Sequence, residues 1–296
     1  MNTKIVSAIY FDLFGTELGG RPGRNDHYLY SLNSIMNIDS AEFIVYTNDK
    51  NKLDSFYSAK YPDKINKYTS IEYDLYNTPY KNKINKIKNK ENTKVSDRCI
   101  ELQYSKFTWL AQNNTDCDYI YWIDAGLCYS GLLPDKYLKT HTGRYYDSYY
   151  GSDIFSDTFL YNLNKFAGDK FFVCAKDNVA NYWDAPLPFI YFNNGHRSDK
   201  HIIGGLFGGG SQSVAVVCDR FSNLSNRVLD QERTLYSEEQ ILSCLFYDYH
   251  PYFIYDTFDI WWHEDNVAGA VGKKDGADLL NNNKSFYKII ERLLFS

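Results

Sequence analysis

The chain lacks any hydrophobic run long enough to cross a membrane. No apolar stretch approaches the roughly 20 residues that a membrane-spanning helix needs. The first residues, MNTKIVSAIYFDLFGTE, bring in Asp12 and Glu17 where a secretory signal would stay apolar or small, so no signal peptide is expected. We therefore predict a cytoplasmic protein with at most peripheral contact at the inner face of a membrane.

The sequence also lacks a basic surplus and paired cysteines. Its net charge of −5 argues against a nucleic-acid partner. The six cysteines form no C-x-x-C motif, and several lie in apolar runs such as ILSCLF (241–246). Buried free thiols are therefore a better interpretation than a disulfide framework.

Aromatic residues, by contrast, are abundant. The chain has 28 Tyr, 19 Phe and 5 Trp among 296 residues, which suits a protein with concave, aromatic-lined sites. A chain of this length can bury about 75% of its unfolded surface, so its core needs no disulfide or metal support.

The first 130 residues alternate between strand and helix patterns. Apolar runs predict strands, hydrophobic spacing predicts helices, and their order is 4–12 (strand), 26–36 (helix), 42–49 (strand), 50–60 (helix), 96–113 (helix) and 118–127 (strand). Such alternation is the signature of βαβ units. We predict a single compact α/β domain with a Rossmann-type, mostly parallel sheet flanked by helices.

The second half of the chain reads differently. After a Tyr-rich stretch, the patterns predict strands near 170–176, 188–193 and 201–211, and helices near 212–228, 237–249 and 285–295. We expect residues 1–130 to form a nucleotide-binding half and residues 131–296 a second half with a mobile, Gly-rich C-terminal tail.

The segment YWIDAG places Asp124 at the carboxyl end of an apolar strand. In open α/β sheets, ligands bind just beyond these strand ends. A carboxylate followed by the small Gly126 can hold a divalent cation against a diphosphate. The alternative is an Asp that only caps the next turn.

Two further motifs lie in the second half. GGLFGGGS (204–211) requires backbone that approaches a neighbour closely or adopts positive φ, as a flat sugar-binding shelf or as a β-bulge with a tight turn. SEEQ (237–240) is an acidic helix start, in which Ser237 is a good N-cap. Glu239 is either part of that cap region or a group at a reacting centre.

The tail contains WWHED (261–265), followed by Lys273 and Lys274. His263 is either a metal ligand or a structural histidine, and the two lysines can neutralise a leaving diphosphate. A Gly-rich tail of this kind can close over a bound nucleotide.

Together these segments resemble a GT-A-type nucleotide-sugar glycosyltransferase. The W-x-D-A-G segment and the later acidic helix start are similar to those of the bacterial HtrL/YibB-type family. GGLFGGGS resembles the GGFFGGS strand of the blood-group A/B transferase family. The resemblance implies a GT-A-like fold and transfer of a hexose from a nucleotide-sugar donor, with UDP favoured, to a glycan or glycolipid acceptor such as a surface polysaccharide or lipopolysaccharide.

The resemblance also implies roles for particular residues. Asp124 would contact a Mn²⁺ or Mg²⁺ ion and the donor diphosphate, with His263 as a second metal ligand. Glu239, with Glu238, would face the anomeric carbon. The remaining expected contacts are Asp12, Thr47, Asn48, Lys106, Gly126, Lys273 and Lys274 toward the donor, and Gly205, Phe207, Gly208 and Gly209 toward the acceptor. Gly126 stands where the second Asp of D-x-D would be, so metal dependence stays open, as does the choice between inversion and retention.

A rival interpretation starts from IYFDLFGTEL (9–18), which resembles the first motif of haloacid-dehalogenase-type hydrolases. Asp12 would then be the covalent nucleophile. FIVYTND (43–49) resembles their second motif, with Thr47 in its role. WIDAG offers one acid rather than the pair that would bind Mg²⁺, and GGLFGGGS stays unexplained. A non-catalytic carbohydrate-binding protein of the same fold is the third possibility.

Overall fold

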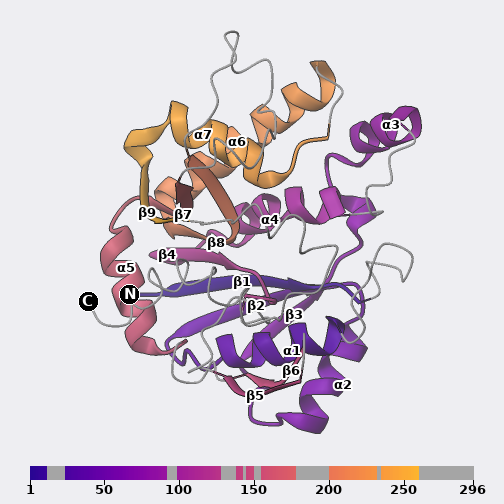
Figure 1. The fold of residues 1–296 in the computed structure, drawn as a ribbon, viewed down its shortest axis with the longest axis vertical. Helices are drawn as coiled ribbons and strands as arrows, with labels where there is room; N and C mark the ends of the chain where they lie inside the picture. Colours follow the sequence, from indigo (N-terminus) through magenta and orange to yellow (C-terminus); the bar gives the residue numbers. More distant parts are fainter. Residues whose placement is uncertain are drawn as a thin grey trace.

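A seven-stranded sheet forms the centre of the computed structural model, with helices on both of its faces (Figure 1). The structure describes residues 1–11, 24–91, 99–127, 138–142, 145–149, 155–177, 200–231 and 235–259. The strands of the sheet, in spatial order, are β3 (Tyr68–Glu72), β2 (Ala41–Thr47), β1 (Thr3–Ile9), β4 (Tyr119–Ile123), β8 (Lys200–Gly210), β7 (Phe171–Asp177) and β9 (Phe253–Asp259). A separate hairpin pairs β5 (Leu138–Thr142) with β6 (Tyr145–Tyr149).

The predicted helices and strands that fall within the described residues occur in the predicted order, but β3, β5, β6, β9 and the helix at 157–167 are not among the predicted elements. The described helices are α1 (Arg24–Ile35), α2 (Lys50–Lys60), α3 (Lys81–Glu91), α4 (Cys99–Asn113), α5 (Asp157–Ala167), α6 (Ser211–Gln231) and α7 (Glu238–Asp248), with 3-10 helices η2 (Leu75–Asn77) and η5 (His250–Tyr252). The strand predicted at 188–193, the helix predicted at 285–295 and the C-terminal tail lie outside the described residues.

The order of the strands creates a topological switch point. β1 pairs in parallel with β2 on one side and with β4 on the other, so the carboxyl ends of all three lie at one edge. The order β3-β2-β1-β4 matches the first four strands of a dinucleotide-binding sheet. β8 joins β4 and β7 in antiparallel fashion, and β7 pairs in parallel with β9. The predicted α/β class with a mostly parallel, helix-flanked sheet is confirmed, and both halves of the chain contribute strands to it.

Aromatic side chains fill the core on both faces of the sheet. β4 alternates between the two hydrophobic clusters, Tyr121 in one and Trp122 in the other. Trp109 of α4 stacks on Tyr46 of β2 with ring centroids 4.4 Å apart. In the described part of the chain, the aromatic surplus therefore serves packing more than it lines a cleft.

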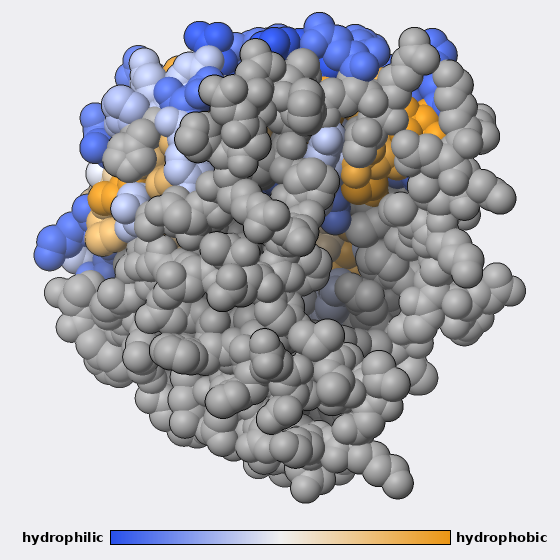
Figure 2. Space-filling model, turned by 45° about the horizontal axis from the view of Figure 1, so that its top comes forward, coloured by the Kyte–Doolittle hydropathy of each residue, from blue (hydrophilic) through white to orange (hydrophobic). Residues whose placement is uncertain are grey.

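Hydrophilic residues dominate the described part of the surface in the space-filling view, with only small hydrophobic areas between them (Figure 2). Among the described residues, no helix is both long and apolar enough to span a bilayer.

The end of β8 needs glycine for two separate reasons. Gly208 and Gly209 have φ values of 139° and 149°, which side-chain-bearing residues rarely adopt. A Cβ on Gly208 would overlap Ile120 of β4, and one on Gly209 would overlap the carbonyl of Lys170. These glycines let β8 lie tightly between its two neighbours.

Replacing Gly209 by Ala is expected to lower the free energy of unfolding by about 2–5 kcal/mol, from backbone strain and the overlap with Lys170. Gly168→Ala is the matched control, because its φ is 57° but no atom lies within 4 Å of the added Cβ. This control should cost about 1–2 kcal/mol. Urea unfolding compares the two variants, and equal losses would contradict this account of the strand packing.

The free energy of unfolding is expected to fall as the pH rises above about 10. Burial raises the pKa of the Tyr57, Tyr104 and Tyr121 phenols, so the folded protein keeps protons that the unfolded chain releases. Their contribution is complete below the unfolded pKa and is lost above it. Urea unfolding at about pH 8 and about pH 11 measures the loss.

Tyr121→Phe removes a buried hydroxyl that has no partner in the described chain. It should leave the stability at about pH 8 unchanged or up to about 1 kcal/mol higher, and it should reduce the alkaline loss. A wild-type stability that does not change with pH would show that these phenols ionise in the folded protein as they do when unfolded.

Candidate functional site

Asp124 directly follows β4, at the edge of the sheet where the parallel neighbours β1 and β4 both end. Its backbone N–H donates to the carbonyl of Gly205 at 2.8 Å, and its own carbonyl accepts from Leu127 at 2.9 Å. The main chain is thus fixed on both sides of the residue. Its side chain is 41% exposed, so the carboxylate is open to a ligand.

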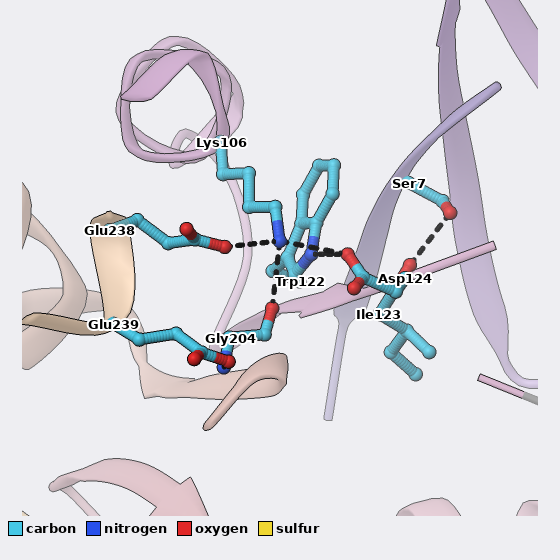
Figure 3. Close-up of polar contacts among 8 residues, drawn as sticks. All are labelled: Ser7, Lys106, Trp122, Ile123, Asp124, Gly204, Glu238 and Glu239. Atoms are coloured by element: carbon cyan, nitrogen blue, oxygen red, sulfur yellow. Dashed lines mark hydrogen bonds and ion pairs between the residues drawn. The ribbon is translucent and has the colours of Figure 1, made fainter. Parts of the chain in front are cut away.

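Two donors approach one oxygen of this carboxylate (Figure 3). The indole N–H of Trp122 donates to Oδ1 at 2.6 Å, and the Lys106 ammonium lies 3.0 Å from the same atom. No described residue donates to Oδ2. The carboxylate is therefore held from the protein side through Oδ1 alone.

Lys106 lies in α4 with its ammonium almost fully buried, its side chain only 7% exposed. Besides Asp124, it reaches Oε1 of Glu238 at 2.8 Å and the carbonyl of Gly204 at 2.9 Å. Burial alone would lower the pKa of Lys106, but the charges of Asp124 and Glu238 outweigh it and raise the pKa. These three acceptors can use all three ammonium hydrogens, so Lys106 forms an internal ion pair in this structure. Its contact with a nucleotide-sugar donor stays a prediction.

The acidic pair begins α7 as predicted. Ser237 caps the helix and forms a capping box with Gln240. Glu238 is buried, its Oε1 bound to Lys106 and its Oε2 without a partner in the described chain. Burial and the nearby Glu239 raise the pKa of Glu238 against the effect of Lys106. The structure therefore places this carboxyl group in the interior beside Lys106, and its contact with a sugar stays a prediction.

Glu239 is the half-exposed member of the pair. Its Oε1 accepts the backbone N–H of Gly204 at 2.8 Å, and the helix carbonyl of Glu239 accepts the Ser243 hydroxyl at 2.7 Å. Ser243 in turn accepts the N–H of Ile202 at 3.2 Å. These bonds fix the first turn of α7 against β8, so Glu239 stands on a rigid support.

A bulge in β8 supplies the backbone groups of the site. Val173 of β7 pairs with Phe207, but the next residue, Cys174, pairs with Ile203. The three residues 204–206 therefore have no partner on β7. The Gly204 carbonyl accepts from Lys106, the Gly204 N–H donates to Glu239, and the Gly205 carbonyl accepts the N–H of Asp124. The Gly-rich segment thus contains a bulge-type irregularity within a continuous strand, and its role as a sugar-binding shelf stays a prediction.

The structure separates the residues predicted to line an acceptor. Phe207 is fully buried and stacks on Phe107 with centroids 4.9 Å apart, so the structure places it in the core, and its acceptor contact stays a prediction. Gly208 and Gly209 lie in the tight strand packing described above. Gly205 is different, because a Cβ there would come within 3.8 Å of Oδ2 of Asp124. Of the four, Gly205 is the one beside the candidate site.

Three other residues predicted to contact the nucleotide-sugar donor lie near the same edge of the sheet. Thr47 is fully buried, and the Asn48 amide bonds to both the N–H and the carbonyl of Phe11, at 2.8 and 3.0 Å. Gly126 leaves room for the Tyr28 ring, 2.6 Å from where a Cβ would stand. Whether Thr47 and Asn48 also contact a nucleoside stays a prediction. Four predicted residues lie outside the described residues: Asp12, His263, Lys273 and Lys274.

Sequence reasoning missed Trp122 and Gly204. The sequence pattern identifies Trp122 only as another apolar residue of a buried strand. Its spacing of two residues from Asp124 nevertheless puts both side chains on the same face of the strand. The pattern also does not distinguish Gly204 from the other glycines of its segment. In the structure, a Cβ on Gly204 would stand 2.5 Å from Oε1 of Glu238, so no side chain fits there.

The described residues suit a cation that is shared with a ligand rather than one enclosed by protein. No group of three His, Cys, Asp or Glu side chains that could hold a metal occurs among them. Asp124 offers one free carboxylate oxygen. Mg²⁺ at phosphate sites is commonly held by one or two carboxylates together with phosphate oxygens and water, and Asp124 fits that requirement.

No protein-family model matches this chain, and no curated protein matches it in sequence. Function is therefore argued from the chemistry of the site itself.

Replacing Lys106 by Met is expected to lower the free energy of unfolding by about 3–5 kcal/mol, because the buried Glu238 carboxylate loses its counter-charge. Lys83→Met is the matched control. It removes an ion pair between α3 and Asp230 at 2.7 Å in which Asp230 is 58% exposed. This control should cost no more than about 1 kcal/mol.

Urea unfolding measures both variants. The double variant Lys106→Met, Glu238→Gln removes the unpaired charge and should recover part of the loss. If Lys106→Met and Lys83→Met lowered the free energy of unfolding equally, Lys106 would not stabilise the fold through the buried cluster.

Proposed function

We propose that this chain is a glycosyltransferase of the GT-A type. It would transfer a hexose from a nucleotide diphosphate sugar, with UDP favoured, to a glycan acceptor such as a surface polysaccharide or a glycolipid. The observation that carries this proposal is the Asp124 carboxylate, which stands at the β1–β4 switch point with Oδ2 free of described donors. Nucleotides bind at such switch points in open α/β sheets.

Asp124 would bind the diphosphate end of the donor. Its Oδ2 would hold Mg²⁺ or Mn²⁺, and the ion would supply charge neutralisation on the departing diphosphate. Asp124 keeps its orientation during this step because Trp122 and Lys106 hold the other oxygen. The nucleoside would lie over the ends of β1 and β2.

Glu239 is the group suited to the reacting carbon. Glycosyl transfer passes through a transition state with positive charge on the sugar ring, which a fixed carboxylate stabilises. The Gly204 N–H holds Glu239 in place and leaves the carboxylate half-exposed. The same group could instead accept the proton of the acceptor hydroxyl. Glu238 would not contact the sugar in this role but would hold Lys106 in place.

One observation keeps the hydrolase as a second candidate. Ile9 pairs with Thr47, and the Asn48 side chain hydrogen-bonds to the backbone N–H and carbonyl of Phe11, the residue before Asp12. The described residues 9–11 of the first hydrolase-like segment therefore lie beside the second segment at the same edge of the sheet. In a hydrolase of this kind, Asp12 would be the nucleophile, and Asp124 would not be the main catalytic group.

A thermal-shift panel with UDP, GDP and CDP, each with Mn²⁺, Mg²⁺ or EDTA, tests the proposal. A nucleotide at 100 times its Kd should add about 2.7 kcal/mol of stability. Asp124→Ala should abolish the response. Asp118→Ala is the control, because it removes a 62% exposed carboxylate just before the opposite end of β4 and should keep the response.

A response that EDTA does not weaken would remove the cation from the proposal and point to Lys273 and Lys274. No nucleotide response in the wild type would overturn the transferase. Phosphate-ester hydrolysis that Asp12→Asn abolishes would then establish the second candidate.

A further inference from the structure

The Trp122 side chain is enclosed in the core, yet its one polar atom reaches the site. The residue is 2% exposed, and its ring stacks with those of Trp109 and Phe207, with centroids 6.0 and 6.4 Å away. The Lys106 ammonium lies 5.2 Å from the ring centroid. This packing restricts the ring, and the indole N–H points at Asp124 (Figure 3).

Oδ1 of Asp124 has no capacity left for a ligand. A carboxylate oxygen offers about two acceptor sites, and Oδ1 receives the Trp122 indole at 2.6 Å and the Lys106 ammonium at 3.0 Å. Oδ2 receives no described donor and belongs to a side chain that is 41% exposed. The two oxygens of one carboxylate are thus divided between the protein and the ligand side.

We infer, on the basis of the function proposed above, that Trp122 is a positioning residue that restricts Asp124 to binding through Oδ2 alone. Trp122 itself would touch neither cation nor nucleotide. A single-oxygen contact suits Mg²⁺ or Mn²⁺ bridged to a diphosphate, whereas Ca²⁺ often takes both oxygens of a carboxylate. Mutation of a group that orients a metal-binding side chain in this way typically weakens metal binding by about 10–100-fold.

Trp109 provides a matched control within the same aromatic stack. It is fully buried like Trp122, but its indole N–H has no partner in the described chain. Trp122→Phe and Trp109→Phe therefore remove the same atoms from neighbouring rings. Only Trp122→Phe takes a hydrogen bond from Asp124.

The first test needs no ligand. In the ¹⁵N–¹H spectrum of the wild-type protein, loss of one signal in each Phe variant assigns the two indoles. Asp124→Ala is expected to shift the Trp122 indole signal and to speed its exchange with solvent, and to leave the Trp109 signal nearly unchanged. A Trp122 signal that does not respond to Asp124→Ala would overturn the inference, even if Trp122→Phe itself failed to fold.

The second test measures binding of UDP with Mg²⁺ by calorimetry. Trp122→Phe is expected to weaken binding by about tenfold or more. Trp109→Phe should change it by less than about twofold, because its N–H makes no bond to lose. Equal affinities in the wild type and Trp122→Phe would overturn the inference while the proposed function stands. If the wild type binds no nucleotide, the proposed function fails, and the spectrum alone decides whether Trp122 holds Asp124.

Discussion

The Lys106 ammonium lies where four parts of the chain meet: helix α4, the end of β4, the bulge of β8 and the first turn of α7. Burying a charge is costly unless opposite charges and hydrogen bonds compensate, and here two carboxylates and a carbonyl do so. Each of these acceptors is fixed in turn by its contact with the ammonium. The orientation of Asp124, the burial of Glu238 and the place of Gly204, which supports Glu239, all depend on this one cation.

The charges of this cluster have a consequence for any ligand. Asp124 and Glu238 share one buried ammonium, and Glu239 adds a third carboxylate to the cluster. Burial first, and then the charges of Glu239 and Asp124, raise the pKa of Glu238 against the effect of Lys106. A diphosphate would bring still more negative charge to the same edge. Binding a nucleotide there therefore requires positive charge beyond Lys106, whose hydrogens are already used. On the proposed function, a divalent cation on Oδ2 meets this requirement, and so would the two lysines of the tail.

Local patterns predicted much of the fold but not the contacts within the site. The apolar run before Asp124, the cap at Ser237 and the alternation of strand and helix are properties of neighbouring residues, and the structure confirms them. The engagement of Lys106 with Glu238 joins residues 132 positions apart, and that with Gly204 joins residues 98 positions apart. No periodicity encodes such distances, so the sequence does not predict the contact between Lys106 and Glu238.

The glycines of β8 are required for different physical reasons. Gly208 and Gly209 are required by their φ values and by the closeness of neighbouring strands, whereas Gly204 is required because Glu238 occupies the place of its side chain. Between them, Leu206 and Phe207 anchor β8 in the core. One strand is thus tightly packed at one end and bulged at the switch point. Because the bulge is supported by a rigid strand, its peptide groups can hold Lys106 and Glu239 in fixed positions, which a flexible loop of similar composition would not do.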